Sequence, residues 1–153
     1  MTIQWLRAVL VLLAATLTLA PGGLRAAEAT STVKLQAQLI WGTNEEKPAD
    51  PKLVRLDEKL EKKLQHIFSW KHYWEINHQL LAVSGGVPQR VSMSKQCDIE
   101  VACVGESEIE LKLFGKGKMV VKKRQKIVRG ESIVLAGDDK DQTAWFVVVT
   151  PPK

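Results

Sequence analysis

A cluster of basic residues in the second half of the chain has the clearest binding chemistry in this sequence. If residues 115–118 form a turn between two strands, most of the cluster shares one hairpin, which we call the basic hairpin. Such a surface attracts polyanions such as lipopolysaccharide, phosphorylated lipid or an acidic protein. Lysines also protect sheet edges against aggregation, so a purely solvated edge stays open as an alternative. The cluster consists of Lys112, Lys116, Lys118, Lys122, Lys123, Arg124, Lys126 and Arg129.

A second cluster is aromatic and flanks one predicted helix. If the strands on either side of that helix are antiparallel neighbours, the aromatic rings meet at one end of a sheet. Exposed rings there would stack on sugars or contact a protein partner, whereas buried rings would fill the core. The sequence is compatible with both an exposed aromatic platform and aromatic core packing. The four residues are Trp41, Trp70, Tyr73 and Trp74.

Metal and catalytic chemistry have little support in the sequence. His72 and His78 would lie on one strand about 20 Å apart, too far to share an ion, and His66 falls late in the predicted helix. Three aspartates within residues 138–141 resemble part of a calcium loop without its glycine and distal glutamate, so we expect a polar hairpin turn. No nucleophile elbow, phosphate loop or metalloprotease helix is present. We expect no cofactor and no metal.

The two cysteines after the N-terminal segment, Cys97 and Cys103, fall on one predicted strand with apolar residues at every odd position. Six strand steps separate them by about 20 Å, whereas a disulfide needs Cα atoms within about 7 Å. We expect two small hydrophobic residues on a buried face. A bridge across an unrecognised turn and an intermolecular bond remain alternatives.

The first 29 residues predict export. Arg7 precedes an uncharged apolar run at 8–20, and small residues lead to a cleavage site near Ala29. A cut after Ala26 and a retained anchor are the alternatives. The run has about 13 residues, against the roughly 20 that cross a bilayer. Residues 30–153 are then one domain in the periplasm or the medium, with no transmembrane segment. Cleavage lowers the net charge from +5 to +4, which is small for a nucleic-acid binder. No aromatic residue interrupts 122–129, which also disfavours single-stranded nucleic acid.

The elements that would position these residues are mostly strands. A half-buried strand spans 33–41, and an amphipathic helix is expected at 51–67, with Asp50 as cap, Pro51 at its first position and a leucine stripe. Aromatic and β-branched residues predict a strand within 70–83. Short strands follow near 90–95, 97–104, 108–114, 119–126, 132–136 and 143–150, joined by glycine-containing turns. The last is apolar on both faces, as in a sheet covered on both sides.

The predicted fold is therefore mainly β (α+β): an antiparallel β-sandwich or partly closed barrel of about 7–8 strands, with one helix packed on the sheet. The segments at 39–44, 50–53, 114–118 and 135–148 resemble a group of small, uncharacterised exported bacterial proteins. That resemblance implies export and no particular activity.

The function we expect is an exported, non-enzymatic interaction module. Its partner would be an envelope protein or an anionic polymer or lipid, bound through the basic hairpin. The alternatives are a carbohydrate-binding module that uses the tryptophans, and a small hydrolase whose residues converge only in the fold.

Overall fold

The computed structural model describes residues 31–46, 50–137 and 143–152 of the chain. The expected leader and the aspartates at 138–141 lie outside the described residues. No helix within the described ranges is long and apolar enough to cross a membrane.

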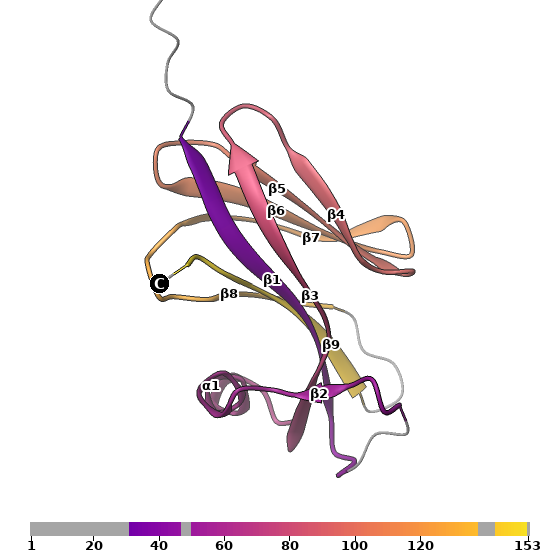
Figure 1. Cartoon of the computed structure of the whole chain (residues 1–153). Coiled ribbons are helices and arrows are strands. Elements are labelled where there is room, and N and C mark those ends of the chain that lie inside the picture. Colours follow the sequence, from indigo (N-terminus) through magenta and orange to yellow (C-terminus); the bar gives the residue numbers. More distant parts are fainter. Residues whose placement is uncertain (1–30, 47–49, 138–142, 153) are drawn as a thin grey trace, which may run out of the picture.

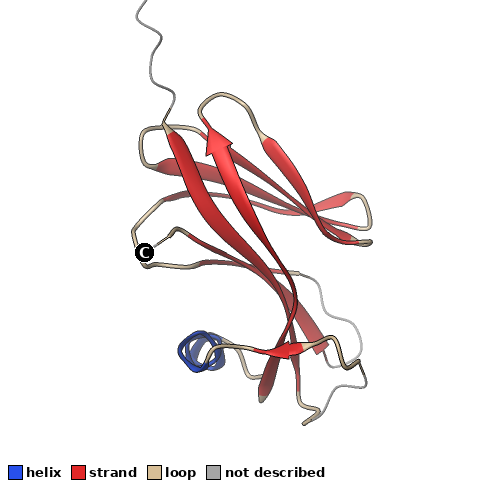
Figure 2. Ribbon diagram, viewed as in Figure 1, coloured by secondary structure: helices blue, strands red, loops and turns tan. Residues whose placement is uncertain are grey.

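Two antiparallel sheets pack together, and the single helix of the described residues lies beside one of them (Figures 1 and 2). The first sheet has the spatial order β2 (Val54–Arg55), β3 (His72–Ser84), β1 (Thr32–Thr43), β9 (Thr143–Thr150), β8 (Ile133–Ala136). The second is a meander of β4 (Gln89–Ser94), β5 (Cys97–Cys103), β6 (Glu108–Gly115) and β7 (Lys118–Lys126). The sandwich is confirmed, and the strands of the described residues form no closed barrel.

Strict alternation of apolar residues builds the core between the two sheets. Leu35, Ala37 and Leu39 of β1 are buried on the face that meets the second sheet. Ile99 of β5 and Leu111 of β6 approach them from the opposite side. Because side chains alternate along a strand, this pattern fixes which face of each strand turns inward.

Strand β9 is buried on both faces, as its sequence predicts. Val147 and Val149 join the core between the sheets, whereas Phe146 and Val148 join a second core on the opposite face. This second, helix-side core is closed by the helix. The prediction of a central strand covered by a sheet and by a leucine-faced helix is therefore confirmed.

The helix α1 (Glu58–Ile67) begins later than its predicted start at residue 51, and that prediction is wrong. Asp57 is the actual cap, and its carboxylate accepts hydrogen bonds from the amides of Lys59 (3.0 Å) and Leu60 (3.2 Å). Asp50 instead accepts from the Lys52 amide at 2.9 Å in a local turn. Both aspartates suit a cap, but the pairing of β2 with β3 keeps Val54 and Arg55 extended, so no helix continues from Asp50.

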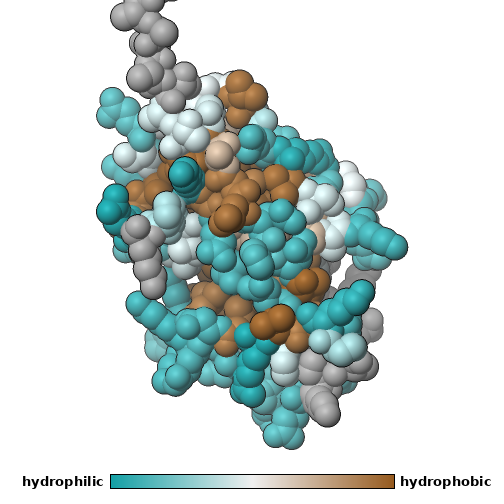
Figure 3. Space-filling view, in the orientation of Figure 1, coloured by the Kyte–Doolittle hydropathy of each residue, from teal (hydrophilic) through white to brown (hydrophobic). Residues whose placement is uncertain are grey.

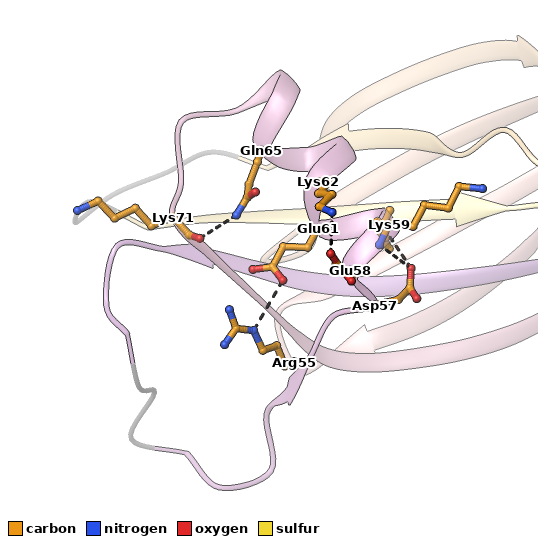
Figure 4. A network of polar contacts seen from close by, with 9 residues as sticks. Arg55, Asp57, Glu58, Lys59, Glu61, Lys62, Gln65 and Lys71 are labelled. Atoms are coloured by element: carbon orange, nitrogen blue, oxygen red, sulfur yellow. Dashed lines mark hydrogen bonds and ion pairs between the residues drawn. The ribbon is translucent and has the colours of Figure 1, made fainter.

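Polar contacts around the helix tie it to its flanking segments (Figure 4). Arg55 Nε lies 3.7 Å from a carboxylate oxygen of Glu61, and the Gln65 side-chain amide donates to the Lys71 carbonyl at 3.0 Å. Leu64 is completely buried, but Ile67 is 54% exposed. The helix therefore docks through Leu64 and leaves Ile67, its last residue, largely in solvent.

The two cysteines lie at opposite ends of β5, as the predicted strand requires, and form no disulfide with each other. Cys97 is buried and Cys103 partly buried, both against the core between the sheets. Burial, with a smaller contribution from the neighbouring Asp98 charge, raises the pKa of Cys97 to about 11.

Candidate functional site

The basic hairpin forms as expected, from β6, a tight turn and β7. Lys116 and Gly117 occupy the turn with positive φ values of 51° and 77°. Strand β7 is an edge of its sheet, so no strand among the described residues pairs with its outer side. Lys123 lies opposite the buried Leu111 yet is itself exposed, which places a charge on the core-facing side of that edge. Such an inward charge protects an edge from pairing with another sheet.

Three residues of the basic hairpin are neutralised by acids on neighbouring positions. The Glu110 carboxylate accepts from Arg124 at 2.7 Å and lies 3.2 Å from Lys122 Nζ. Lys112 donates to Glu100 of the adjacent strand at 2.7 Å. The hydrogen bond from Arg124 holds the pKa of Glu110 below its ordinary value, and the bond to Glu100 raises the pKa of Lys112.

The outer face of the second sheet is therefore a mixed charge ladder rather than a basic patch. Arg90 extends the ladder, since its guanidinium contacts Asp98 at 3.0 Å and lies 4.0 Å from the centre of the Phe114 ring. Exposed ion pairs of this kind add little stability, but they cancel much of the field that a polyanion would sense.

Three lysines without an ion pair in the described residues adjoin at the turn end of the hairpin. Lys116 and Lys118 are exposed, and no ion pair within the described ranges involves them. Exposed Lys95 belongs to the neighbouring β4–β5 turn. The two turns are joined by a 2.8 Å hydrogen bond from the Lys116 amide to the Gln96 carbonyl, and both project from the same end of the sheet (Figure 1). We call Lys95, Lys116 and Lys118 the basic tip.

The remaining basic residues of the hairpin lie away from the basic tip. Lys123 and Lys126 are exposed along β7, and Arg129 follows the strand. Sequence reasoning missed Lys95, because only the pairing of β4 with β5 and of β6 with β7 brings the two turns together.

The four predicted aromatic residues do not gather on one surface. Tyr73 is completely buried in the helix-side core, where Trp70 packs against it. The Tyr73 hydroxyl donates to the Phe68 carbonyl at 3.4 Å. Trp41 and Trp74 are paired neighbours on β1 and β3. Their side chains point away from Tyr73, since adjacent residues of a strand face opposite sides.

A third tryptophan extends the pair of Trp41 and Trp74 into a row. Trp145 of β9 is the cross-strand partner of Trp41, so the three residues are in register across β3, β1 and β9. Cross-strand partners share one face of a sheet. All three residues are partly buried, and the Trp145 ring packs against Gly137 and the core between the sheets. We call Trp74, Trp41 and Trp145 the tryptophan row.

The tryptophan row meets the base of the basic hairpin. A Cβ placed on Gly115 would lie 3.5 Å from Cζ2 of Trp145 and 3.1 Å from Cγ2 of Val120. The indole of Trp145 therefore reaches the last residue of β6, next to the basic tip. Lys118 is the cross-strand partner of Gly115, so its side chain leaves the hairpin on the side that faces Trp145.

The histidines lie apart. His66 is exposed on the helix, His78 contacts Glu75 at 2.9 Å, and the ring of His72 is partly buried on β3. No group of three or more potential metal ligands occurs among the residues that the structure describes.

A shallow apolar depression lies on the other face of the first sheet. It is lined mainly by Leu80, Ala82 and Pro152, with Lys34 and Gln36 at its border. Leu80 is 81% exposed, and Figure 3 shows hydrophobic surface over β1 and β3. The depression therefore offers a ligand apolar contact and the ammonium group of Lys34.

No protein-family model, curated protein or solved structure matches this chain.

Proposed function

We propose that the protein is an exported interaction module that binds an anionic component of the cell envelope through its basic tip. One observation carries the proposal: Lys95, Lys116 and Lys118 lie on two adjoining turns with no carboxylate paired to them in the described part of the chain. Lys112, Lys122 and Arg124, by contrast, are already paired with Glu100 or Glu110. The ligand would be a negatively charged polymer or lipid, and an acidic surface on an envelope protein is the alternative partner.

The basic tip is a better anchor than the whole basic hairpin. Lys122 and Arg124 already share the carboxylate of Glu110, so an incoming anion would have to compete with a 2.7 Å charge-assisted bond. The lysines of the tip have no such competitor and stand at a projecting end of the sheet. Electrostatic attraction of this kind weakens as salt rises.

Heparin serves as the polyanion probe. The purified protein should be retained on a heparin column at about 50 mM salt and elute below about 300 mM. The triple variant with Lys95, Lys116 and Lys118 changed to Gln should elute at clearly lower salt. Its matched control changes Lys59, Lys63 and Lys71 to Gln, which removes the same charge from exposed sites around the helix.

The control variant separates a site from a net-charge effect. Elution of the control at the wild-type salt concentration supports the basic tip. An equal loss in both variants, or no retention of the wild-type protein at low salt, refutes the proposal.

Export is supported by the apolar run at 8–20 and the small residues near Ala29. Expression of the full chain in a Gram-negative bacterium should deliver a protein whose N-terminus begins near residue 30, outside the cytoplasm. A full-length N-terminus in the cytoplasmic fraction would refute export.

A carbohydrate-binding module is the second candidate, and the tryptophan row favours it. Three partly exposed indoles in register offer flat apolar faces, on which the C–H face of a sugar ring packs well. Quenching of tryptophan fluorescence by neutral glycans would support this candidate over the polyanion.

A further inference from the structure

We infer that the basic tip and the tryptophan row form one binding site, and that its ligand is an acidic oligosaccharide in which neutral rings adjoin a carboxylate- or sulfate-bearing ring. The inference rests on the proposed function and specifies its ligand. It joins two features that lie on different sheets and far apart in the sequence.

The packing between the sheets brings the two features together. Trp145 ends the row at β9, and its ring reaches Gly115 of β6, directly before the turn. Gly137 permits this placement of the indole, because a Cβ there would overlap three atoms of the Trp145 ring, whereas at Gly115 a Cβ would make ordinary contact with it. Lys118 pairs with Gly115 and faces the same side as Trp145. Cationic and aromatic groups therefore adjoin at a single place.

The dimensions of the row suit a short chain of sugars. Neighbouring strands are about 4.8 Å apart, so the three indoles extend over about 10 Å from β9 to β3. That length is comparable with a disaccharide or trisaccharide. The Trp145 ring reaches Gly115, directly before the turn of the basic tip, so the tip adjoins the β9 end of the row and would meet a charged group of the ligand there.

The position of the charges distinguishes sugars from nucleic acid. A single strand of nucleic acid carries a phosphate at every base, and its binding sites place cations along the whole stacking platform. Here the lysines of the basic tip cluster on two adjoining turns. The protein's modest net charge of +5 over the whole chain also disfavours a nucleic-acid ligand.

The test uses a hyaluronan hexasaccharide, in which carboxylate-bearing and neutral rings alternate. Chitohexaose is the neutral comparator, polyphosphate is a polyanion without sugar rings, and a thymidine hexanucleotide represents nucleic acid. Binding is measured by calorimetry at about 50 mM salt, with the tryptophan fluorescence of the wild-type protein recorded in parallel. We expect hyaluronan to bind at least about tenfold more tightly than chitohexaose and to change the fluorescence.

Variants assign the two halves of the site. Lys116→Gln with Lys118→Gln should weaken hyaluronan binding by about three- to tenfold, the range for exposed charge contacts. Trp74→Leu should weaken it by about three- to tenfold through lost ring contacts, and Trp74→Phe by less. The matched control, Lys59→Gln with Lys63→Gln, should bind as the wild type does. Circular dichroism establishes that each variant folds, and the wild-type fluorescence change tests the row even if Trp74→Leu unfolds.

Each contrary result has its own meaning. If polyphosphate binds as tightly as hyaluronan and fluorescence stays constant, the composite site is refuted while the proposed polyanion function stands. If the thymidine hexanucleotide binds more tightly than hyaluronan, the ligand class is wrong. If no polyanion binds at low salt, the proposed function fails together with the inference.

Discussion

Replacing Gly42 by alanine tests whether Trp70 belongs to the helix-side core. A Cβ on Gly42 would lie 2.9 Å from both Phe146 Cε2 and Trp70 Cδ1, about 0.5 Å inside ordinary van der Waals contact. Both rings would have to retreat, and overpacking of this kind costs about 1–3 kcal/mol. The smaller conformational freedom of alanine in the unfolded chain offsets about 0.4–1 kcal/mol.

We therefore expect Gly42→Ala to lower the free energy of unfolding by about 1–2 kcal/mol. For a domain of this size the melting temperature should fall by about 3–8 °C. Urea unfolding followed by circular dichroism gives the free energy, and a thermal melt gives the shift. Gly105→Ala is the matched control, because its nearest neighbour would be 3.7 Å away at Glu108 Cβ and its φ is not positive. Equal stability of the Gly42 and Gly105 variants would refute the placement of Trp70.

Three further changes probe the remaining elements. Leu64→Ala should lower the free energy of unfolding by about 2–5 kcal/mol and reduce the helical circular-dichroism signal, because Leu64 is completely buried. Ile67→Ala should lower it by less than about 0.5 kcal/mol, because Ile67 is exposed. Similar losses for both variants in urea unfolding would contradict the docking of the helix. The folded state lowers the pKa of Glu110, so its carboxylate stabilises the fold above its ordinary pKa, and this stabilisation is lost as pH falls through the folded pKa. Glu110→Gln should therefore have a lower free energy of unfolding than the wild type at pH 7, and the difference should vanish below about pH 4. Urea unfolding at several pH values measures the difference, and a difference that does not change with pH would contradict this. Cys97, with a pKa of about 11, should react with a thiol reagent at pH 8 at least about 100-fold more slowly than free cysteine does. After unfolding, both Cys97 and Cys103 should react. Fewer than two reactive thiols in the unfolded protein would reveal a disulfide.

The strands were predictable because their signals are local. Alternating apolar residues and glycine-containing turns placed β4 to β9 close to their observed bounds. The double-sided apolar pattern of β9 also predicted its central position. These features depend only on period and turn chemistry, which a short stretch of sequence contains.

The start of the helix was not predictable from local signals. Asp50 with Pro51 and Asp57 both satisfy the preference for a cap, and only the second begins a helix. The choice depends on the pairing of Val54 and Arg55 with β3, a contact between segments distant in the sequence. Non-local pairing of this kind overrides capping preference.

The composition of the site depended equally on strand register. The sequence around Trp145 predicts a buried strand, but nothing near it indicates that Trp145 aligns with Trp41 and Trp74. The acids that neutralise the basic hairpin are on β5 and β6, opposite their partners. A count of charges along 112–129 therefore overstates the positive surface of the folded protein.

The most direct test of the shared site of the tryptophan row and the basic tip uses the indole N–H signals in a two-dimensional ¹H–¹⁵N NMR spectrum. On addition of the hyaluronan hexasaccharide, the signals of Trp41, Trp74 and Trp145 should shift, while that of Trp70, on the opposite face of the sheet, should stay in place. A shift of Trp70 alone, or no indole shift under saturating ligand, would contradict the account.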